Sequence, residues 1–197
     1  QFQNQPAAGD LMQSVDVLSE DEGFGALPLQ ERDRPMGGIG RHAAAGEAAA
    51  MRERFPSGWI AIQVSAEFGD DATLDALAAG LDRLQRDTGL GLVLFCAGRA
   101  PWHDDPAVLH RLRARLAAPA DCIVAASTSL LELCALLAGC TLCLASSLHA
   151  RIVAEAFARP AASLVLASAR GQGDKLRAYL DVMPDEPGLA PVDARQQ

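Results

Sequence analysis

Two serines and a histidine stand where an apolar, strand-like segment meets an amphipathic, helix-like one in residues 143–160, CLASSLHARIVAEAFARP. Ser146 and Ser147 close the first segment, and His149 opens the second. An imidazole at such a turn can transfer a proton as a general acid or base, or donate a hydrogen bond to a phosphate or carboxylate. Serine and histidine at the start of a helix are also ordinary capping residues, and position alone favours that structural role.

Further polar residues follow other apolar runs and are candidates for the same site. They are His103 and Asp104 after the second run, and Arg170 and Lys175 after the last. Asp105, by contrast, precedes Pro106 and has the pattern of a helix N-cap. A serine hydrolase is disfavoured, because the chain has no G-x-S-x-G motif and no acid positioned beside His149.

Five short apolar runs, separated by amphipathic segments, must position these residues. The runs are 59–66, 90–98, 121–127, 141–147 and 161–167. Between the third and fourth runs, Ser129 and Glu132 have the pattern of a capping box that opens a helix ending at Gly139. Glu155 lies in the middle of the helix after His149, where we expect a solvated position.

This alternation predicts an α/β fold, a Rossmann-like, doubly wound parallel sheet of about five strands. Parallel neighbours require crossover helices, which bury both faces of the sheet. Such sheets bind ligands at the carboxyl ends of their strands. We therefore expect the candidate residues to form a polar rim at that edge, beside helix N-termini that favour anionic ligands.

Composition narrows the class of protein. The 197 residues carry 17 Lys and Arg against 25 Asp and Glu, a formal charge of −8, so no nucleic-acid partner is expected. No apolar run approaches the roughly 20 residues of a membrane span, and the start QFQNQPAAGD lacks the features of a signal peptide. The five cysteines lie in apolar segments, which favours reduced thiols and the cytoplasm. Cys140 and Cys143 form a lone C-x-x-C pair, so no metal site is expected.

Three regions are predicted along the chain. Residues 1–54, whose first forty are rich in Gln, Gly, Pro and acids, are expected to be a linker or the remnant of an N-terminal half, with a short helix. Residues 55–183 are expected to form the Rossmann-like α/β domain. Residues 184–197 are expected to be a flexible tail.

One family resemblance covers residues 59–182. In LLELCALLAGCTLCLASSLHARIVAEAFARPAASLVL, a helix runs into an apolar strand, then an S-L-H turn, a small-residue helix ending in Pro, and a further strand. This order is similar to the C-terminal half of the polysaccharide pyruvyl transferase family. Upstream, WIAIQVSAE, LVLFCAG and PWHDDPAVLHRL are similar to the family's preceding strands and its His-Asp-containing loop. GDKLRAYL resembles the lysine-bearing segment after the family's last strand.

The resemblance implies a glycosyltransferase-like (GT-B) two-domain fold, of which this chain shows the C-terminal domain. It implies a transferase that moves pyruvate from phosphoenolpyruvate, as a ketal, to a sugar of a cell-surface or exopolysaccharide precursor. The implied acceptor is a glycan or lipid-linked sugar, and no cofactor or metal is required. The resemblance makes His149 the proton donor or acceptor. The polar rim at the strand ends supplies the candidate substrate-binding residues, which are Ser146, Ser147, His103, Asp104, Arg170 and Lys175.

The chain departs from the family at one position and in its length. Ser147 stands where many members carry arginine, so the donor's anionic groups would depend on helix N-termini, Arg170 or Lys175. Family members also have an N-terminal α/β half, without which we expect ligand binding but no turnover. Two other functions stay open: a GT-B nucleotide-sugar glycosyltransferase, using Glu155 and Lys175 for ribose or phosphate, and a non-catalytic ligand-binding or assembly module. The acceptor sugar and the oligomeric state, a homo-oligomer included, stay open as well.

Overall fold

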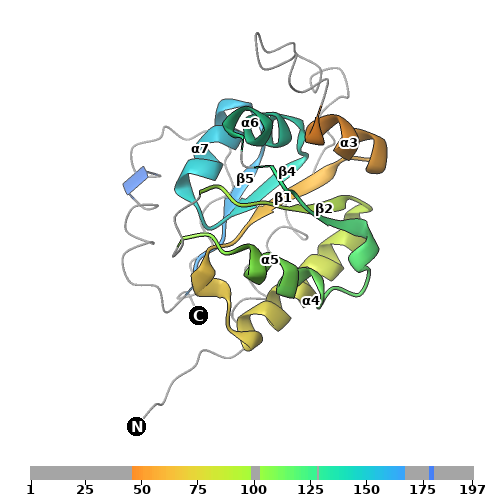
Figure 1. Cartoon of the computed structure of the whole chain (residues 1–197), viewed down its shortest axis with the longest axis vertical. Coiled ribbons are helices and arrows are strands. Elements are labelled where there is room, and N and C mark those ends of the chain that lie inside the picture. The colour runs from red at the N-terminus through yellow and green to blue at the C-terminus, as the bar shows by residue number, and fades with distance from the viewer. Residues whose placement is uncertain (1–45, 99–102, 128, 167–177, 180–197) are drawn as a thin grey trace.

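A parallel sheet of five strands organises the chain (Figure 1). The computed structural model describes residues 46–98, 103–127, 129–166 and 178–179. The strands are β1 (Trp59–Gln63), β2 (Gly91–Leu94), β3 (Cys122–Val124), β4 (Leu142–Ala145) and β5 (Ala161–Ser163). Each lies inside one of the five predicted apolar runs and ends earlier than that run does. The predicted α/β parallel sheet is therefore confirmed.

The strand order is β3-β2-β1-β4-β5, and every neighbouring pair is parallel. The chain moves outward from β1 to β3, then crosses back to place β4 on the other side of β1. This reversal is the topological switch point of a doubly wound sheet, where the loops after the two central strands diverge and leave a crevice. The ends of β1 and β4 therefore mark the place to look for a ligand site.

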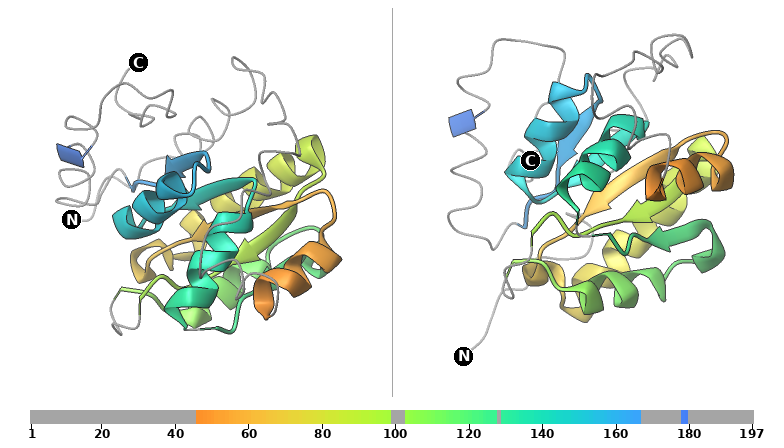
Figure 2. Two further views of the ribbon diagram at one scale, coloured as in Figure 1. Left: turned by 90° about the horizontal axis from the view of Figure 1, so that it is seen from above. Right: turned by 45° about the horizontal axis from the view of Figure 1, so that its top comes forward.

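Helices cover both faces of the sheet. α4 and α5 pack together on one face, and α3, α6 and α7 lie side by side on the other (Figure 2). Short 3-10 turns, η2 and η3, follow β1 and precede β3. The bounds are α3 (Glu47–Arg54), η2 (Ala66–Phe68), α4 (Asp71–Thr88), α5 (Pro106–Arg113), η3 (Pro119–Asp121), α6 (Leu130–Gly139) and α7 (Leu148–Ala156).

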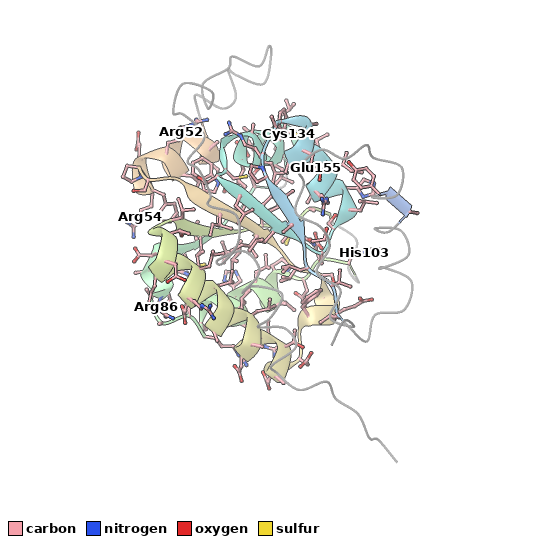
Figure 3. The ribbon with its side chains drawn as sticks, turned by 180° about the vertical axis from the view of Figure 1, so that it is seen from behind. Arg52, Arg54, Arg86, His103, Cys134 and Glu155 are labelled. Atoms are coloured by element: carbon pink, nitrogen blue, oxygen red, sulfur yellow. The ribbon has the colours of Figure 1, made fainter. Side chains whose placement is uncertain are left out.

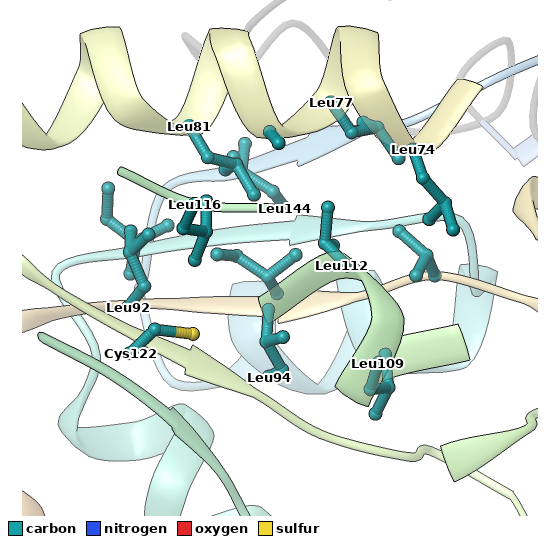
Figure 4. Close-up of a cluster of buried hydrophobic side chains, with 14 of the residues drawn as sticks. Leu74, Leu77, Leu81, Leu92, Leu94, Leu109, Leu112, Leu116, Cys122 and Leu144 are labelled. Atoms are coloured by element: carbon teal, nitrogen blue, oxygen red, sulfur yellow. The ribbon is translucent and has the colours of Figure 1, made fainter. Parts of the chain in front are cut away.

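Alternate residues of each strand enter two separate cores. Ile60 of β1 pairs in register with Leu92 and Leu142, and all three belong to the core beneath α4 and α5 (Figure 4). Ala61 and Cys143, one position further along their strands, belong to the core beneath α6 and α7. Because both faces are buried, the strands read as continuous apolar runs in the sequence rather than as alternating ones.

Local capping patterns set most helix starts. Asp105 accepts a hydrogen bond from Ala107 N at 2.8 Å and Pro106 is the first residue of α5, as predicted. The predicted capping box at Ser129 is wrong, because the Ser129 side chain makes no capping hydrogen bond. Ser127 Oγ accepts from Ser129 N at 3.1 Å and donates to the Glu132 carboxylate instead. α6 nevertheless begins directly after Ser129 and ends at the predicted Gly139.

The helix α3 packs against α6, although it precedes the predicted domain start at residue 55. Its Met51 is buried in the core beneath α6 and α7. Its Glu47 Oε1 accepts from Ala126 N at 2.8 Å and Ser127 N at 3.0 Å, which joins the helix to the loop after β3. In the part of the chain that the structure describes, no helix is long and apolar enough to cross a membrane.

Candidate functional site at the switch point

A buried amide connects the two strands that flank the switch point. Gln63, the last residue of β1, is only 1 % exposed. Its backbone oxygen accepts from Ser146 N at 3.0 Å, just beyond the end of β4. Its side-chain Oε1 accepts from Ser147 N at 2.8 Å and from Ser146 Oγ at 3.2 Å. The end of β1 thus holds the turn that leads into α7.

The same amide also holds the loop after β2. Gln63 Nε2 donates to Asp104 Oδ1 at 2.7 Å, and Gly98 N donates to Asp104 Oδ2 at 2.7 Å. The His103 carbonyl oxygen accepts from Ala66 N at 2.9 Å, which ties this loop to the turn after β1. Asp104 therefore closes the loop after β2 on itself and fastens it to the end of β1, and its role in binding substrate stays a prediction.

The two serines of the S-L-H turn are engaged in local hydrogen bonds. Ser147 is the N-cap of α7, and its hydroxyl accepts from Ala150 N at 3.4 Å, so the capping role favoured by position is confirmed. Ser146 Oγ accepts from Ser65 N at 2.9 Å besides donating to Gln63. Both serines shape the turn through these bonds, and substrate binding by their hydroxyls stays a prediction.

The two histidines of the predicted site are exposed. His149 lies in the first turn of α7, directly beyond the Ser147 cap, and His103 lies in the loop before α5. Neither imidazole has a hydrogen-bond partner among the described residues, so both rings are available to a ligand. Figure 3 shows His103 on the side of the molecule opposite Arg54 and Arg86, which belong to the amino-terminal edge.

One buried polar group at this edge lacks a partner. Ser65 is 6 % exposed, and its hydroxyl has no hydrogen-bond partner in the described part of the chain. A buried hydroxyl without a partner costs about 1–3 kcal/mol, and such groups in folded proteins call for a ligand, a water or a strain-related explanation. Its backbone N–H contacts Ser146 Oγ, so the hydroxyl belongs to the same loop junction.

An ion pair on α7 was not predicted from the sequence. Arg151 is 2 % exposed, and it donates to Glu155 Oε1 at 2.7 Å and to Ser163 Oγ at 3.2 Å. The Tyr179 hydroxyl donates to Glu155 Oε2 at 2.7 Å, which raises the pKa of Tyr179. The expectation that Glu155 is solvated is therefore wrong. The i,i+4 spacing of arginine and glutamate was the available signal.

The remaining candidates are two basic residues near the C-terminus and the two cysteines of the C-x-x-C pair. Arg170 and Lys175 lie outside the described residues, so their roles stay predictions. Cys140 and Cys143 are both buried, and burial raises the pKa of Cys140 to about 12, which keeps its thiol protonated. Within the described ranges, no three His, Cys, Asp or Glu side chains gather in a way that could hold a metal ion.

Comparison with known proteins finds likeness among solved structures. No protein-family model matches the chain, and no curated protein matches it. Among solved structures, the chain is similar to a UDP-GlcNAc 2-epimerase from Neisseria meningitidis bound to UDP-GlcNAc, with 16 % identity and a TM-score of 0.42. The match covers 66 % of this chain and 33 % of the epimerase, so the chain spans about a third of the length of that protein.

Proposed function

We propose that this chain is the donor-binding half of a polysaccharide pyruvyl transferase. In this proposal phosphoenolpyruvate binds at the carboxyl edge of the sheet, and its pyruvyl group is transferred as a ketal to a sugar. The observation that carries the proposal is the place of His149. Its exposed imidazole stands in the first turn of α7, at the switch point where doubly wound sheets bind ligands.

The start of α7 suits an anionic donor. α7 has nine residues, and its first N–H groups carry the positive end of the helix dipole. Ser147 N donates to Gln63 and Ala150 N donates to Ser147 Oγ, whereas Leu148 N and His149 N have no acceptor among the described residues. These two N–H groups can donate to a phosphate or carboxylate oxygen. They would supply part of what an arginine at position 147 would otherwise provide.

The chemistry needs a group that moves protons. One sugar hydroxyl loses its proton and its oxygen bonds to C2 of the enolpyruvyl group, while a proton reaches the methylene carbon, which becomes a methyl. The bond from C2 to the phosphate oxygen then breaks, and the second sugar oxygen bonds to C2 as its proton passes to the departing phosphate. Phosphate departs and the ketal remains. An imidazole titrates near neutral pH, so His149 can deliver or accept one of these protons.

Binding of phosphoenolpyruvate to this chain is the first test. We expect isothermal titration calorimetry to show binding that His149→Ala weakens at least tenfold without lowering thermal stability. His110→Ala is the matched control, because His110 is another exposed histidine, on α5, and its replacement should leave binding unchanged. If His149→Ala binds the donor as well as the wild type, the role of His149 is refuted.

Two ligand results separate this function from its alternatives. Binding of UDP or a UDP-sugar without phosphoenolpyruvate would favour the nucleotide-sugar glycosyltransferase. Failure to bind either ligand would favour the non-catalytic module. The activity test adds a sugar acceptor to a protein that also carries an N-terminal half. There, His149→Ala should abolish release of phosphate and formation of the ketal, and retained turnover would contradict the proposal.

A further inference from the structure

The side chain of Gln63, at the end of β1, contacts two of the loops that build the carboxyl edge: the loop after β2, at Asp104, and the loop after β4, at Ser146 and Ser147. We propose that Gln63 is a positioning residue, whose amide fixes the first turn of α7 and thereby the place of His149, while Asp104 fixes the direction of the amide. This inference rests on the proposed function insofar as His149 acts on the donor. It adds a residue that contacts no reacting group and works through the α7 backbone.

Hydrogen-bond chemistry permits only one orientation of this amide. Asp104 Oδ1 lies 2.7 Å from Nε2 and, as a carboxylate oxygen, can only accept. Ser147 N lies 2.8 Å from Oε1 and can only donate. In the reversed amide, the side-chain oxygen would face Asp104 Oδ1, which cannot donate, and the NH2 group would face the Ser147 N–H, which cannot accept. Because Gln63 is 1 % exposed, water could not repair those contacts.

The contact from Gln63 to Ser147 sets the position of the start of α7. Ser147 is the N-cap of α7, and its carbonyl oxygen accepts from Arg151 N at 3.2 Å, the first bond of the helix. His149 is two residues further along the same turn. A shift of Ser147 therefore moves Leu148 N, His149 N and the imidazole together. A displacement near 1 Å at such a site is enough to lower activity strongly.

Exchanging the amide of Gln63 and the carboxylate of Asp104 tests the proposal. Gln63→Glu puts two carboxylates in contact, and Asp104→Asn leaves Gly98 N and Gln63 Nε2 competing for one amide oxygen. In the double variant, the new amide at position 104 can donate to the new carboxylate at position 63, whose other oxygen still accepts from Ser147 N. The double variant keeps the net charge of the wild type. It should restore the network that each single variant breaks.

We expect Gln63→Glu to raise the dissociation constant for phosphoenolpyruvate about tenfold, which corresponds to about 1.4 kcal/mol. Asp104→Asn should raise it less, and the double variant should return to within about threefold of the wild type. Gln85→Glu is the matched control, since Gln85 makes its hydrogen bond to Asp121 O on the exposed surface. If the dissociation constant of the double variant is raised by the product of the two single-variant increases, the positioning role is refuted.

A second readout separates this inference from the proposed function. Backbone amide resonances of Ser147, Leu148 and His149 report the first turn of α7 without any ligand. Both single variants should displace these resonances, and the double variant should restore them, even if the wild type binds no phosphoenolpyruvate. In that case the proposed function fails and the positioning role stands. Unmoved resonances in Gln63→Glu would overturn the positioning role, whatever the ligand result.

Discussion

The ion pair between the buried Arg151 and the partly buried Glu155 should contribute measurably to the stability of the protein. Arg151→Met removes a guanidinium that is 2 % exposed and bonded to both Glu155 and Ser163. Breaking a buried ion pair by removing one partner costs about 3–5 kcal/mol, because the other charge is left uncompensated. The Glu155 side chain is 26 % exposed and keeps its bond to Tyr179, so we expect a smaller loss, about 2–3 kcal/mol.

The structure supplies a matched control on α4. Arg83 and Asp87 are also spaced i,i+4, but their side chains are 36 % and 53 % exposed and their closest N–O distance is 3.9 Å. Arg83→Met should therefore change the free energy of unfolding by less than about 0.5 kcal/mol. Replacing both members of the buried pair, as Arg151→Met with Glu155→Leu, should recover most of the loss, since no charge is then left unpaired.

Urea denaturation at pH 7 measures these differences, and a thermal scan should show Arg151→Met melting about 4–12 °C below the wild type. The reasoning is refuted if Arg151→Met loses less than about 0.5 kcal/mol, as an exposed pair would. It is also refuted if the double replacement is as unstable as the sum of the two single ones.

Two further predictions follow from the cap of α4 and from the thiols. Asp70 accepts from Thr73 N at 2.9 Å, and hydrogen bonding from Thr73 holds the pKa of Asp70 below its ordinary 3.8. Asp70→Ala should therefore lower the free energy of unfolding by about 0.5–1 kcal/mol at neutral pH. The difference from the wild type should disappear as the pH falls below about 3.8, because the Asp70 carboxylate is then protonated. A difference that stays constant from pH 7 to pH 2 would contradict this prediction. In native protein at pH 8, a thiol reagent should label only the half-buried Cys96 and Cys134, because burial protects the other three thiols; immediate labelling of all five would contradict the buried positions.

The elements that sequence reasoning predicted are those specified by neighbouring residues. The five strands are continuous apolar runs, and the start of α5 is encoded by the adjacent Asp105 and Pro106. The predicted runs continue past the observed strands. Beyond Gln63 and Ala145, side-chain acceptors replace the regular backbone ladder: Ser65 N donates to Ser146 Oγ, and Ser147 N donates to the Gln63 side chain.

The contacts of the site depend on residues far apart in the sequence. Gln63 looks like one more strand residue in WIAIQVSA, and its partners Asp104 and Ser147 lie 41 and 84 positions away. Their proximity follows only from the strand order, which no local pattern encodes. The capping box at Ser129 failed for a different, local reason, because the nearby Ser127 hydroxyl donates to the Glu132 carboxylate and accepts from Ser129 N.

The central claim is that the loops at the ends of β1 and β4 bind phosphoenolpyruvate. The most direct measurement is a titration of the isotopically labelled chain with phosphoenolpyruvate, followed by backbone amide and histidine ring resonances. We predict that the largest shifts occur at Ser147, Leu148 and His149. A cavity of about 410 Å³ lies at the opposite edge, lined in part by Arg54 and Arg86. Shifts confined to that cavity, or no shifts at saturating ligand, would contradict the claim.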